Sequence, residues 1–539
     1  MKYIMKQPMY IFPLVMLLHI ISGCSSEKDT VVPDDDNPSV DMSTTCRSPE
    51  ETGLYQTFYK PQHGYVGDPM PYYNTDDNKF YLFYLYENAN KHPIYLTRTN
   101  DYATFDGFME VLPAGAPGSQ EEWIGTGSFI KKDHVYYCFY TGHNGNLSPA
   151  EKVMLATSAD LLNWTKQPTA TFQASNGYDQ NNFRDPHVYW DDTRNSYVML
   201  VTTRKDDQGV IARYTSTDLT NWSQIEPLVA TSSNNPGVYE IETDAEILEC
   251  PDIFKIGSKW YLTFSRINRD EHRKTFYRIA DSPNGPWKIC RDASGHHETF
   301  DGLYMYAAKT ASDGNTRYLS GWASTGQTVN SNNELHWSGS LITHKLVQQP
   351  SGKLYPAIPD AVDAKFSSRL PLAKITSEGT VLGDNGSYIV TAQSSSRSYA
   401  LFNRNTSPVK ISMTIDASQS DQFGFSFGVC GDLSEIYSVS FDLTSSGRWG
   451  MPSVFMHQEA KNTGTSVTNK AELNFTPLVV PSNKVFDVKI VMEKSLCIVY
   501  INDQVAFTNR ITKMNQNPWT IFADKGTVKV SGLTVEKAS

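Results

Sequence analysis

Apolar and aromatic residues recur in short runs between about residue 60 and residue 345, and polar turns separate the runs. Several runs lie in pairs on either side of a turn, as antiparallel hairpins do. Five such pairs begin at Phe80, Gly127, His187, Ile253 and Met305. No long stretch has the apolar spacing of a helix. The pattern therefore predicts an all-β protein.

A second element follows most of these pairs, a short strand that runs into a polar turn ending in an aromatic residue. It reads LATSADLLNWTK from Leu155, RYTSTDLTNWSQ from Arg213 and RIADSPNGPWK from Arg278, with a looser copy from Leu96. Units of about four strands that recur along a chain are typical of a β-propeller. A large β-sandwich is the alternative, but the doubled motif favours a five-bladed propeller over residues 51–347.

The pattern changes after about residue 346. Residues 348–375 contain several prolines and are predicted to be a linker. Residues 376–539 alternate apolar and polar positions, as the half-buried strands of a β-sandwich do. This second domain has no obvious cluster of acids, so we expect a supporting or binding role for it.

The first residues have the pattern of an export signal. Lys2 and Lys6 precede an apolar run that is too short for a comfortable membrane span. The run ends in Ile-Ser-Gly-Cys24, which resembles the lipobox of bacterial lipoproteins, where the cysteine is acylated. A polar, acidic tether at residues 25–50 follows. We expect residues 1–24 to be a lipoprotein signal peptide rather than an ordinary cleaved one. The protein would then be anchored by lipid in the cell envelope, at the outer-membrane surface or in the periplasm of a Gram-negative bacterium.

Composition narrows the function. The 30 Tyr, 25 Phe and 10 Trp suit both pleated sheets and stacking against sugar rings. The net charge of −11, without a basic patch, argues against a nucleic-acid partner. Besides Cys24, six cysteines are too widely spaced for a metal cluster or a dense disulfide framework, so no metal site is predicted.

Three acidic stretches with an adjacent proline each lie beside a predicted strand pair. They are Gly-Asp68-Pro, the Arg-Asp185-Pro of FRDPHVYW, and Glu249-Cys-Pro-Asp. Alone, each is explained by a turn carboxylate, a salt bridge or a solvated acidic loop. However, all three occupy equivalent points of the repeat, and the innermost strands of propeller blades face one central funnel. Asp68, Asp185 and Glu249 are therefore predicted to converge from blades one, three and four.

Converging carboxylates suit the cleavage of a glycosidic bond. Repulsion and burial raise the pKa of at least one of them, which leaves a protonated acid beside an ionised one. The acid can protonate the leaving oxygen while the carboxylate attacks or activates water at the anomeric carbon. Arg184 would keep Asp185 ionised through a charge-assisted hydrogen bond. We therefore expect a glycosidase whose partner is an oligo- or polysaccharide.

The same residues resemble glycoside hydrolase family 32, the invertase, levanase and inulinase family. The resemblance rests on FRDPHVYW, ECPDIF and GTGSFIKKDHVYYCFYTGH, and on VYINDQVAFTNRI in the second domain. It implies a β-fructosidase with Asp68 as nucleophile, Glu249 as general acid/base and Asp185 as transition-state stabiliser. It also implies retention of configuration, with the Asp68 and Glu249 carboxyl groups roughly 5–5.5 Å apart, and no metal or organic cofactor.

The chain departs from the family pattern around Asp68. Gly67 and Met70 stand where the family has Asn, and Leu85 stands where it has Gln. Those amides line the sugar subsite, so their loss implies an unusual fructoside, another glycoside, or reduced activity. The residues predicted to bind the sugar are Arg184, Trp123, Ser128, Tyr72 and Trp337, with His336 as a further candidate.

Two other functions remain open on this sequence. One is an inverting glycosidase that resembles the arabinan- and xylan-cleaving propellers of family 43, with the two carboxyl groups about 6.5–9.5 Å apart. The other is a surface lipoprotein that binds glycans and has lost catalysis. The Glu-Cys-Pro-Asp motif and the second domain favour the retaining fructosidase over the first alternative.

Overall fold

The computed structural model describes residues 55–539, apart from residues 89–90, 176, 231–244, 269–273, 293–294, 326–336, 394–395, 406–407, 430–435, 445–449, 462–466 and 512–516. The predicted signal peptide, Cys24, the tether and His336 lie outside this part of the chain. Within it, no helix has the length and apolar character needed to cross a membrane.

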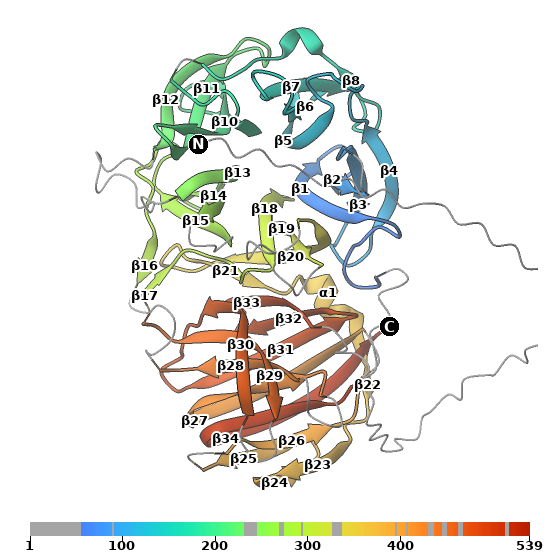
Figure 1. Ribbon diagram of the computed structural model, residues 1–539, viewed down its shortest axis with the longest axis vertical. Coiled ribbons are helices and arrows are strands. Elements are labelled where there is room, and N and C mark those ends of the chain that lie inside the picture. Colours follow the sequence, from blue (N-terminus) through green and yellow to red (C-terminus); the bar gives the residue numbers. More distant parts are fainter. Residues whose placement is uncertain are drawn as a thin grey trace, which may run out of the picture. The chain divides into compact units, whose positions relative to one another are not determined.

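The first half of the described chain forms antiparallel blades around a ring (Figure 1). Blade one contains β1 (Tyr65–Asn74), β2 (Lys79–Glu87), β3 (Ile94–Thr99) and β4 (Asp106–Leu112). Blade two contains β5 (Trp123–Lys132), β6 (Val135–His143), β7 (Glu151–Ser158) and β8 (Thr165–Lys166). A short 3-10 helix at Pro168–Ala170 leads to blade three, which contains β9 (Phe183–Asp191), β10 (Ser196–Lys205), β11 (Gln208–Ser216) and β12 (Ser223–Ala230).

Two further blades complete the ring. Blade four contains β13 (Ala245–Ile256), β14 (Lys259–Asn268) and β15 (Lys274–Ala280), and a small hairpin of β16 (Cys290–Asp292) and β17 (Gly295–His297) follows it. Blade five contains β18 (Met305–Ser312), β19 (Arg317–Ser324), β20 (Gly339–Gln348) and β21 (Leu354–Ala357). Strand β20 also pairs with β1, at Gly339 and Val66, which joins the last blade to the first. The first strands of the blades contact each other in the order β1, β5, β9, β13, β18 and back to β1. The predicted five-bladed propeller is confirmed.

The repeated turn motif has a local cause. In the copy after β7, the Ser158 hydroxyl accepts the N–H groups of Asp160 and Leu161, and the Asp160 carboxylate accepts those of the next two residues. Ser216 and Asp218 make the same four bonds after β11. The closing tryptophan packs between blades, since the Trp164 ring meets the ring of Phe83, on β2 of blade one, edge-on at 6.2 Å. The motif therefore encodes both a turn and a contact with the neighbouring blade.

The second half of the described chain is a β-sandwich that follows the short helix α1 (Asp360–Lys365). Its strands are β22 (Phe366–Leu370), β23 (Lys374–Glu378), β24 (Thr380–Asp384), β25 (Ser387–Ala392), β26 (Ser398–Phe402), β27 (Val409–Phe427), β28 (Ile436–Asp442), β29 (Ser453–Lys461), β30 (Val467–Pro477), β31 (Val485–Glu493), β32 (Leu496–Ile501), β33 (Val505–Arg510) and β34 (Trp519–Ala538).

The long strands β27 and β34 pair with each other and link the rest of the sandwich. The first part of β27 pairs with β31 and its last part pairs with β28, after a series of register shifts. Hydrogen bonds fasten the sandwich to the propeller: the Thr508 N–H donates to Asp301 at 2.7 Å, and Arg510 Nε donates to the Ser324 carbonyl at 2.7 Å. The predicted order of propeller and sandwich is thus also confirmed.

Candidate active site

Each of the five innermost strands is interrupted by a β-bulge at the same level of the propeller. The register shifts fall after Val66 in β1, after Gly125 in β5, after Arg184 in β9, after Glu249 in β13 and after Tyr306 in β18. A bulge leaves an unpaired residue and turns its side chain away from the regular alternation of the strand. The bulges therefore place one ring of side chains at one level: Asp68, Thr126, Asp185, Cys250 and Ala307.

Three of these bulged residues have a strained backbone. The φ angles of Asp185, Cys250 and Ala307 are 57°, 52° and 52°, in the left-handed region that residues with a Cβ seldom adopt. Each such residue costs about 1–3 kcal/mol and persists only where the surrounding structure enforces it. Strain repeated on three neighbouring blades marks this layer as a functional site.

Asp68 is held at both of its carboxylate oxygens. Thr126 Oγ1 donates to Oδ2 at 2.7 Å, and Trp322 Nε1 donates to Oδ1 at 2.8 Å. Burial raises the pKa of Asp68 above its ordinary value, and the nearby charge of Glu249 adds to that effect, while the two hydrogen bonds oppose it. The carboxylate is thus fixed in orientation by neutral donors, one from blade two and one from blade five.

Glu249 is held differently. Arg184 Nη2 donates to its Oε1 at 2.8 Å, and the Tyr306 hydroxyl donates to its Oε2 at 2.7 Å. The same guanidinium donates to Asn182 Oδ1 at 3.2 Å and approaches Glu151 Oε2 at 3.5 Å. Although burial alone lowers the pKa of Arg184, the surrounding carboxylates raise it, so the guanidinium is a permanent cation beside Glu249.

Asp185 is buried and interacts electrostatically with both of these carboxylates. Its Oδ2 accepts the Cys250 N–H at 2.9 Å, and its own N–H donates to Thr141 Oγ1 at 2.9 Å. Burial raises the pKa of Asp185, and Arg184, whose Nε lies 4.0 Å from Oδ2, opposes the rise. Repulsion from Glu249 and Asp68 raises it further, which shows that the three carboxylates interact. The structure thus brings Asp68, Asp185 and Glu249 into one cluster, together with Arg184.

The other residues predicted to bind the sugar divide into two groups. Trp123 has 39% of its surface exposed, and its ring meets that of His92 edge-on at 5.1 Å. The Trp337 ring stacks on the His92 ring, and the two ring centroids are 4.4 Å apart. Because His92 interacts electrostatically with Asp68, this aromatic group adjoins the carboxylate cluster.

Ser128 and Tyr72 lie elsewhere, on a separate axial cavity of about 270 Å³ that is also lined by His187 and Asp252. Tyr72 is four residues beyond Asp68, roughly 13 Å along an extended strand, and its ring packs edge-on against Tyr136. The Ser128 hydroxyl is buried and accepts the Val188 N–H at 3.0 Å, so it fastens β9 to β5. The structure does not place either residue among the carboxylates.

Several members of the site were not predicted. Thr126 and Tyr306 occupy the bulge level of β5 and β18, so the repeat register that identified the acids also points to them. Trp322 comes from a second strand, β19, and Glu151 comes from β7. His92 lies in the connection between β2 and β3. No repeat position marks these last three residues.

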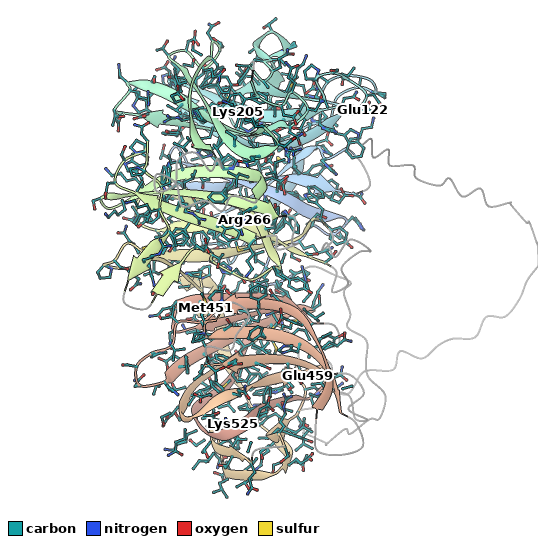
Figure 2. The ribbon with its side chains drawn as sticks, turned by 60° about the vertical axis from the view of Figure 1, so that its left-hand side comes forward. Glu122, Lys205, Arg266, Met451, Glu459 and Lys525 are labelled. Carbon is teal, nitrogen blue, oxygen red and sulfur yellow. The ribbon has the colours of Figure 1, made fainter. Side chains whose placement is uncertain are left out.

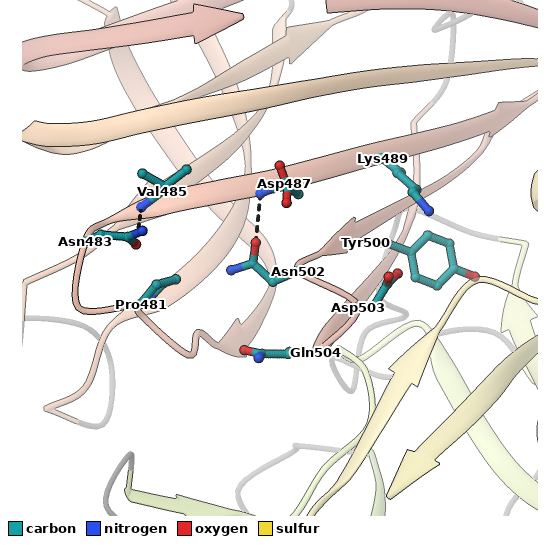
Figure 3. Close-up of a pocket in the computed structure, with 9 residues that line it drawn as sticks. All are labelled: Pro481, Asn483, Val485, Asp487, Lys489, Tyr500, Asn502, Asp503 and Gln504. Atoms are coloured by element: carbon teal, nitrogen blue, oxygen red, sulfur yellow. Dashed lines mark hydrogen bonds between the residues drawn. The ribbon is translucent and has the colours of Figure 1, made fainter. Parts of the chain in front are cut away.

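Outside the propeller axis, a polar hollow of about 410 Å³ lies on the sandwich (Figure 3). Asp487 and Asp503 line it, but the Asp487 carboxylate already accepts the Thr414 hydroxyl at 2.8 Å, and the Asp487 N–H donates to Asn502 Oδ1 at 2.7 Å. Across the described residues, no group of His, Cys, Asp and Glu has an arrangement that could hold a metal ion. In that part of the chain, Cys138, Cys250 and Cys497 are buried free thiols.

Comparison with known proteins gives two family matches and a set of relatives. The sucrose-6-phosphate hydrolase of Staphylococcus xylosus is 26% identical over 313 residues, which cover 56% of this chain and 61% of that enzyme. The raffinose invertase of Escherichia coli is 26% identical over 342 residues, which cover 60% of this chain and 68% of that enzyme. The chain thus spans about three fifths of the length of the first relative.

Solved structures with the same fold include the exo-inulinase of Aspergillus awamori. That structure superposes with a TM-score of 0.67 at 17% identity, over 92% of this chain and 99% of the other. The family model for the N-terminal domain of glycosyl hydrolases family 32 matches residues 58–355, and the one described as the GH32, BT1760-like, C-terminal domain matches residues 352–535. Since the first model alone covers more than half of the sequence, this chain belongs to glycoside hydrolase family 32.

Proposed function

We propose that this protein hydrolyses β-fructosides, such as fructans or sucrose-like oligosaccharides, with retention of configuration. The observation that carries the proposal is the unequal support of two clustered carboxylates. Asp68 is held only by the neutral donors Thr126 and Trp322, whereas Glu249 is paired with the cation Arg184. Two carboxylates with different partners suit two different chemical roles.

Asp68 is oriented to act as the nucleophile. In the first step it attacks the anomeric carbon, the glycosidic C–O bond breaks, and Glu249 gives its proton to the leaving oxygen. Arg184 stabilises the Glu249 carboxylate that remains. In the second step Glu249 takes a proton from water, the water oxygen bonds to the anomeric carbon, and Asp68 is released. Asp185, fixed by its strained backbone, holds sugar hydroxyl groups and stabilises the positive charge of the transition state.

The relatives support fructosides as the substrate class. Their names describe a sucrose-6-phosphate hydrolase, a raffinose invertase and, in Meyerozyma guilliermondii, an extracellular exo-inulinase. All three activities concern sugars with a fructosyl unit. We therefore propose that the substrates of this chain contain a fructosyl unit, and we do not choose among those three substrates.

A product screen with protein that lacks residues 1–24 tests this function. We expect fructose or short fructans from levan, inulin or sucrose, and NMR of the first-formed anomer should show retention. Glu249→Gln should lower kcat/KM by about 10²–10⁴-fold, the usual contribution of a general acid. Asp192→Asn, at an exposed residue directly after β9, is the matched control and should have no effect. An inverted product, or cleavage of arabino-oligosaccharides alone, would instead favour the family 43-like mechanism.

We also propose that Cys24 carries a lipid that anchors the enzyme in the cell envelope. The support is the Ile-Ser-Gly-Cys24 sequence and the acidic tether after it. Metabolic labelling with an alkyne fatty acid should mark the full chain and fail to mark Cys24→Ser. Labelling of both forms, or of neither, would contradict the anchor.

A further inference from the structure

The glycine before Asp68 makes room for an aromatic ring. A Cβ atom added to Gly67 would lie 2.3 Å and 2.4 Å from two ring carbons of Trp337, and 3.0 Å from the Leu85 carbonyl oxygen. The φ angle of Gly67 is not among the positive ones, so its backbone conformation does not require glycine. Glycine is required at this position because the Trp337 indole lies directly against the backbone.

Trp337 joins two apolar clusters at the site. On one side it packs against Cys250, Tyr306, Ala307 and Trp322, which belong to the bulge layer or touch it. Its ring centroid lies 6.5 Å from that of Trp322, the residue that donates to Asp68. Trp337 therefore contacts the residue that hydrogen-bonds the proposed nucleophile, Asp68.

On the other side Trp337 packs against the cluster that contains Met70 and Leu85. These two residues have 1% and 2% of their surfaces exposed, and the Met70 sulfur accepts the Gly127 N–H at 3.1 Å. Gly67, Met70 and Leu85 are the three positions at which the sequence departs from its family's amides. The three departures thus form one packing unit with Trp337.

The exposed side of this unit is aromatic. His92 stacks on Trp337 and is held by Glu87, whose Oε2 lies 2.8 Å from its Nε2. Trp123 meets His92 edge-on and is exposed. We call Trp337, His92 and Trp123 the aromatic wall. Sugar sites commonly combine such apolar and aromatic walls with a few placed polar groups.

We propose that the aromatic wall sets the specificity of the subsite for the reacting sugar. The ring faces of the wall contact carbon–hydrogen groups of the sugar ring, and Gly67, Met70 and Leu85 offer the hydroxyls next to the wall no side-chain hydrogen bond. We therefore expect the subsite to accept two kinds of substrate. One is the plain fructoside, and the other is a fructoside whose hydroxyls next to the wall are substituted or absent. This inference rests on the proposed function, because it assigns a sugar preference to the same site.

A double-mutant cycle tests the packing half of the proposal. Trp337→Ala should raise KM roughly 10- to 200-fold, the range for losing apolar contact in a pocket, with the acid limb of the pH profile unmoved. Gly67→Ala should raise KM in the wild type, because the new Cβ displaces the indole. It should have little effect when Trp337 is already alanine. Trp190→Ala, an exposed tryptophan at the end of β9, is the control.

Additive losses in the cycle, or an unchanged KM in Trp337→Ala, would overturn the proposal. So would a shifted acid limb, since that would show that Trp337 only supports Asp68. Trp337→Phe keeps an aromatic ring and should retain most of the affinity. It serves as the second variant if Trp337→Ala has a lowered Tm.

Monodeoxy analogues of an aryl β-fructofuranoside test the substrate half. A site that hydrogen-bonds a hydroxyl rejects the analogue that lacks it by about 10⁴–10⁵-fold. We expect at least one ring-hydroxyl analogue to be hydrolysed within roughly 200-fold of the parent compound. Losses of about 10⁴-fold or more for every analogue would overturn the proposal.

If the wild type cleaves no fructoside, the proposed function fails, and fluorescence quenching with fructose and 1-kestose still tests the wall. Binding that Trp337→Ala weakens would support the wall independently. Equal binding by both proteins, or no binding to the wild type, would overturn it.

Discussion

The propeller axis and the sandwich each bury an arginine among carboxylates, on different kinds of backbone. In the sandwich, Arg397 donates to Glu459 at 2.8 Å and to Asp524 at 2.7 Å, and its guanidinium lies over the Phe522 ring. Glu459, marked in Figure 2, also accepts the Ser438 hydroxyl. None of these residues has a positive φ angle.

At the propeller axis, Arg184 is surrounded by Glu249, Glu151 and Asp185, and the backbone at Asp185 and Cys250 has positive φ angles. In the described part of the chain, Asp68 forms no ion pair with a cation, and burial raises its pKa. The comparison separates two uses of buried charge. Closed pairing on a backbone without positive φ angles stabilises a domain, whereas incomplete pairing on a strained backbone leaves charge available for chemistry.

The largest effect is expected at Asp68. Asp68→Asn removes the nucleophile and should lower kcat by about 10⁴-fold or more. It should also stabilise the fold at neutral pH, by roughly 0.5–2 kcal/mol, as relieved functional strain often does. Enzyme assays and urea unfolding measure the two effects.

The sign of the stability effect follows from the raised pKa of Asp68. The unfolded chain ionises this group at its ordinary pKa, while the folded protein resists ionisation up to a higher pH. Folding is therefore penalised once the pH rises above the ordinary carboxyl range. The advantage of Asp68→Asn should be present at pH 7 and vanish below about pH 4. Equal destabilisation at both pH values would show that Asp68 is structural.

The second effect concerns the sandwich pair. Arg397→Met removes the cation that pairs with the buried Glu459 and the half-buried Asp524, and it should reduce stability by about 3–5 kcal/mol. The kcat of the folded fraction should be unchanged. Lys525→Met, on an exposed neighbour labelled in Figure 2, should change stability by less than about 0.5 kcal/mol. A fall in kcat of folded Arg397→Met would remove the distinction between the two networks.

The smallest effect concerns the Thr126 hydrogen bond. This bond favours the ionised form of Asp68, so Thr126→Ala should raise the pKa of Asp68 further. The acid limb of kcat/KM should move to higher pH by roughly half to one unit. Thr157→Ala, on β7, should leave the limb in place. A limb that stays in place, or moves to lower pH, in Thr126→Ala would mean that another group controls it.

The sequence predicted the propeller well because its repeat is encoded locally. The turn with Ser158 and Asp160 is closed by hydrogen bonds within a few residues, so it can be recognised without a structure. The acids can be recognised for a related reason, because Asp68 and Asp185 lie in the equivalent bulges of two innermost strands and Glu249 directly precedes the bulge of a third. A sequence repeat can predict positions that are set by the register of a single strand.

Other parts of the site depend on contacts between distant segments. Trp322 reaches Asp68 and Glu151 reaches Arg184 from strands that the repeat does not distinguish. Ser128 and Tyr72 were grouped with the site, but the length of an extended strand carries them to the axial cavity. The reason for Gly67 becomes visible only when Trp337 is seen to lie against it.

A trapped intermediate tests the central claim most directly. In Glu249→Gln, a fructosyl donor with a good leaving group should still react with Asp68, because it needs no acid, while hydrolysis of the intermediate is slowed. Mass spectrometry of the protein and its peptides should find one fructosyl unit on Asp68. An adduct on another residue, or rapid turnover with no adduct and an inverted product, would contradict the account.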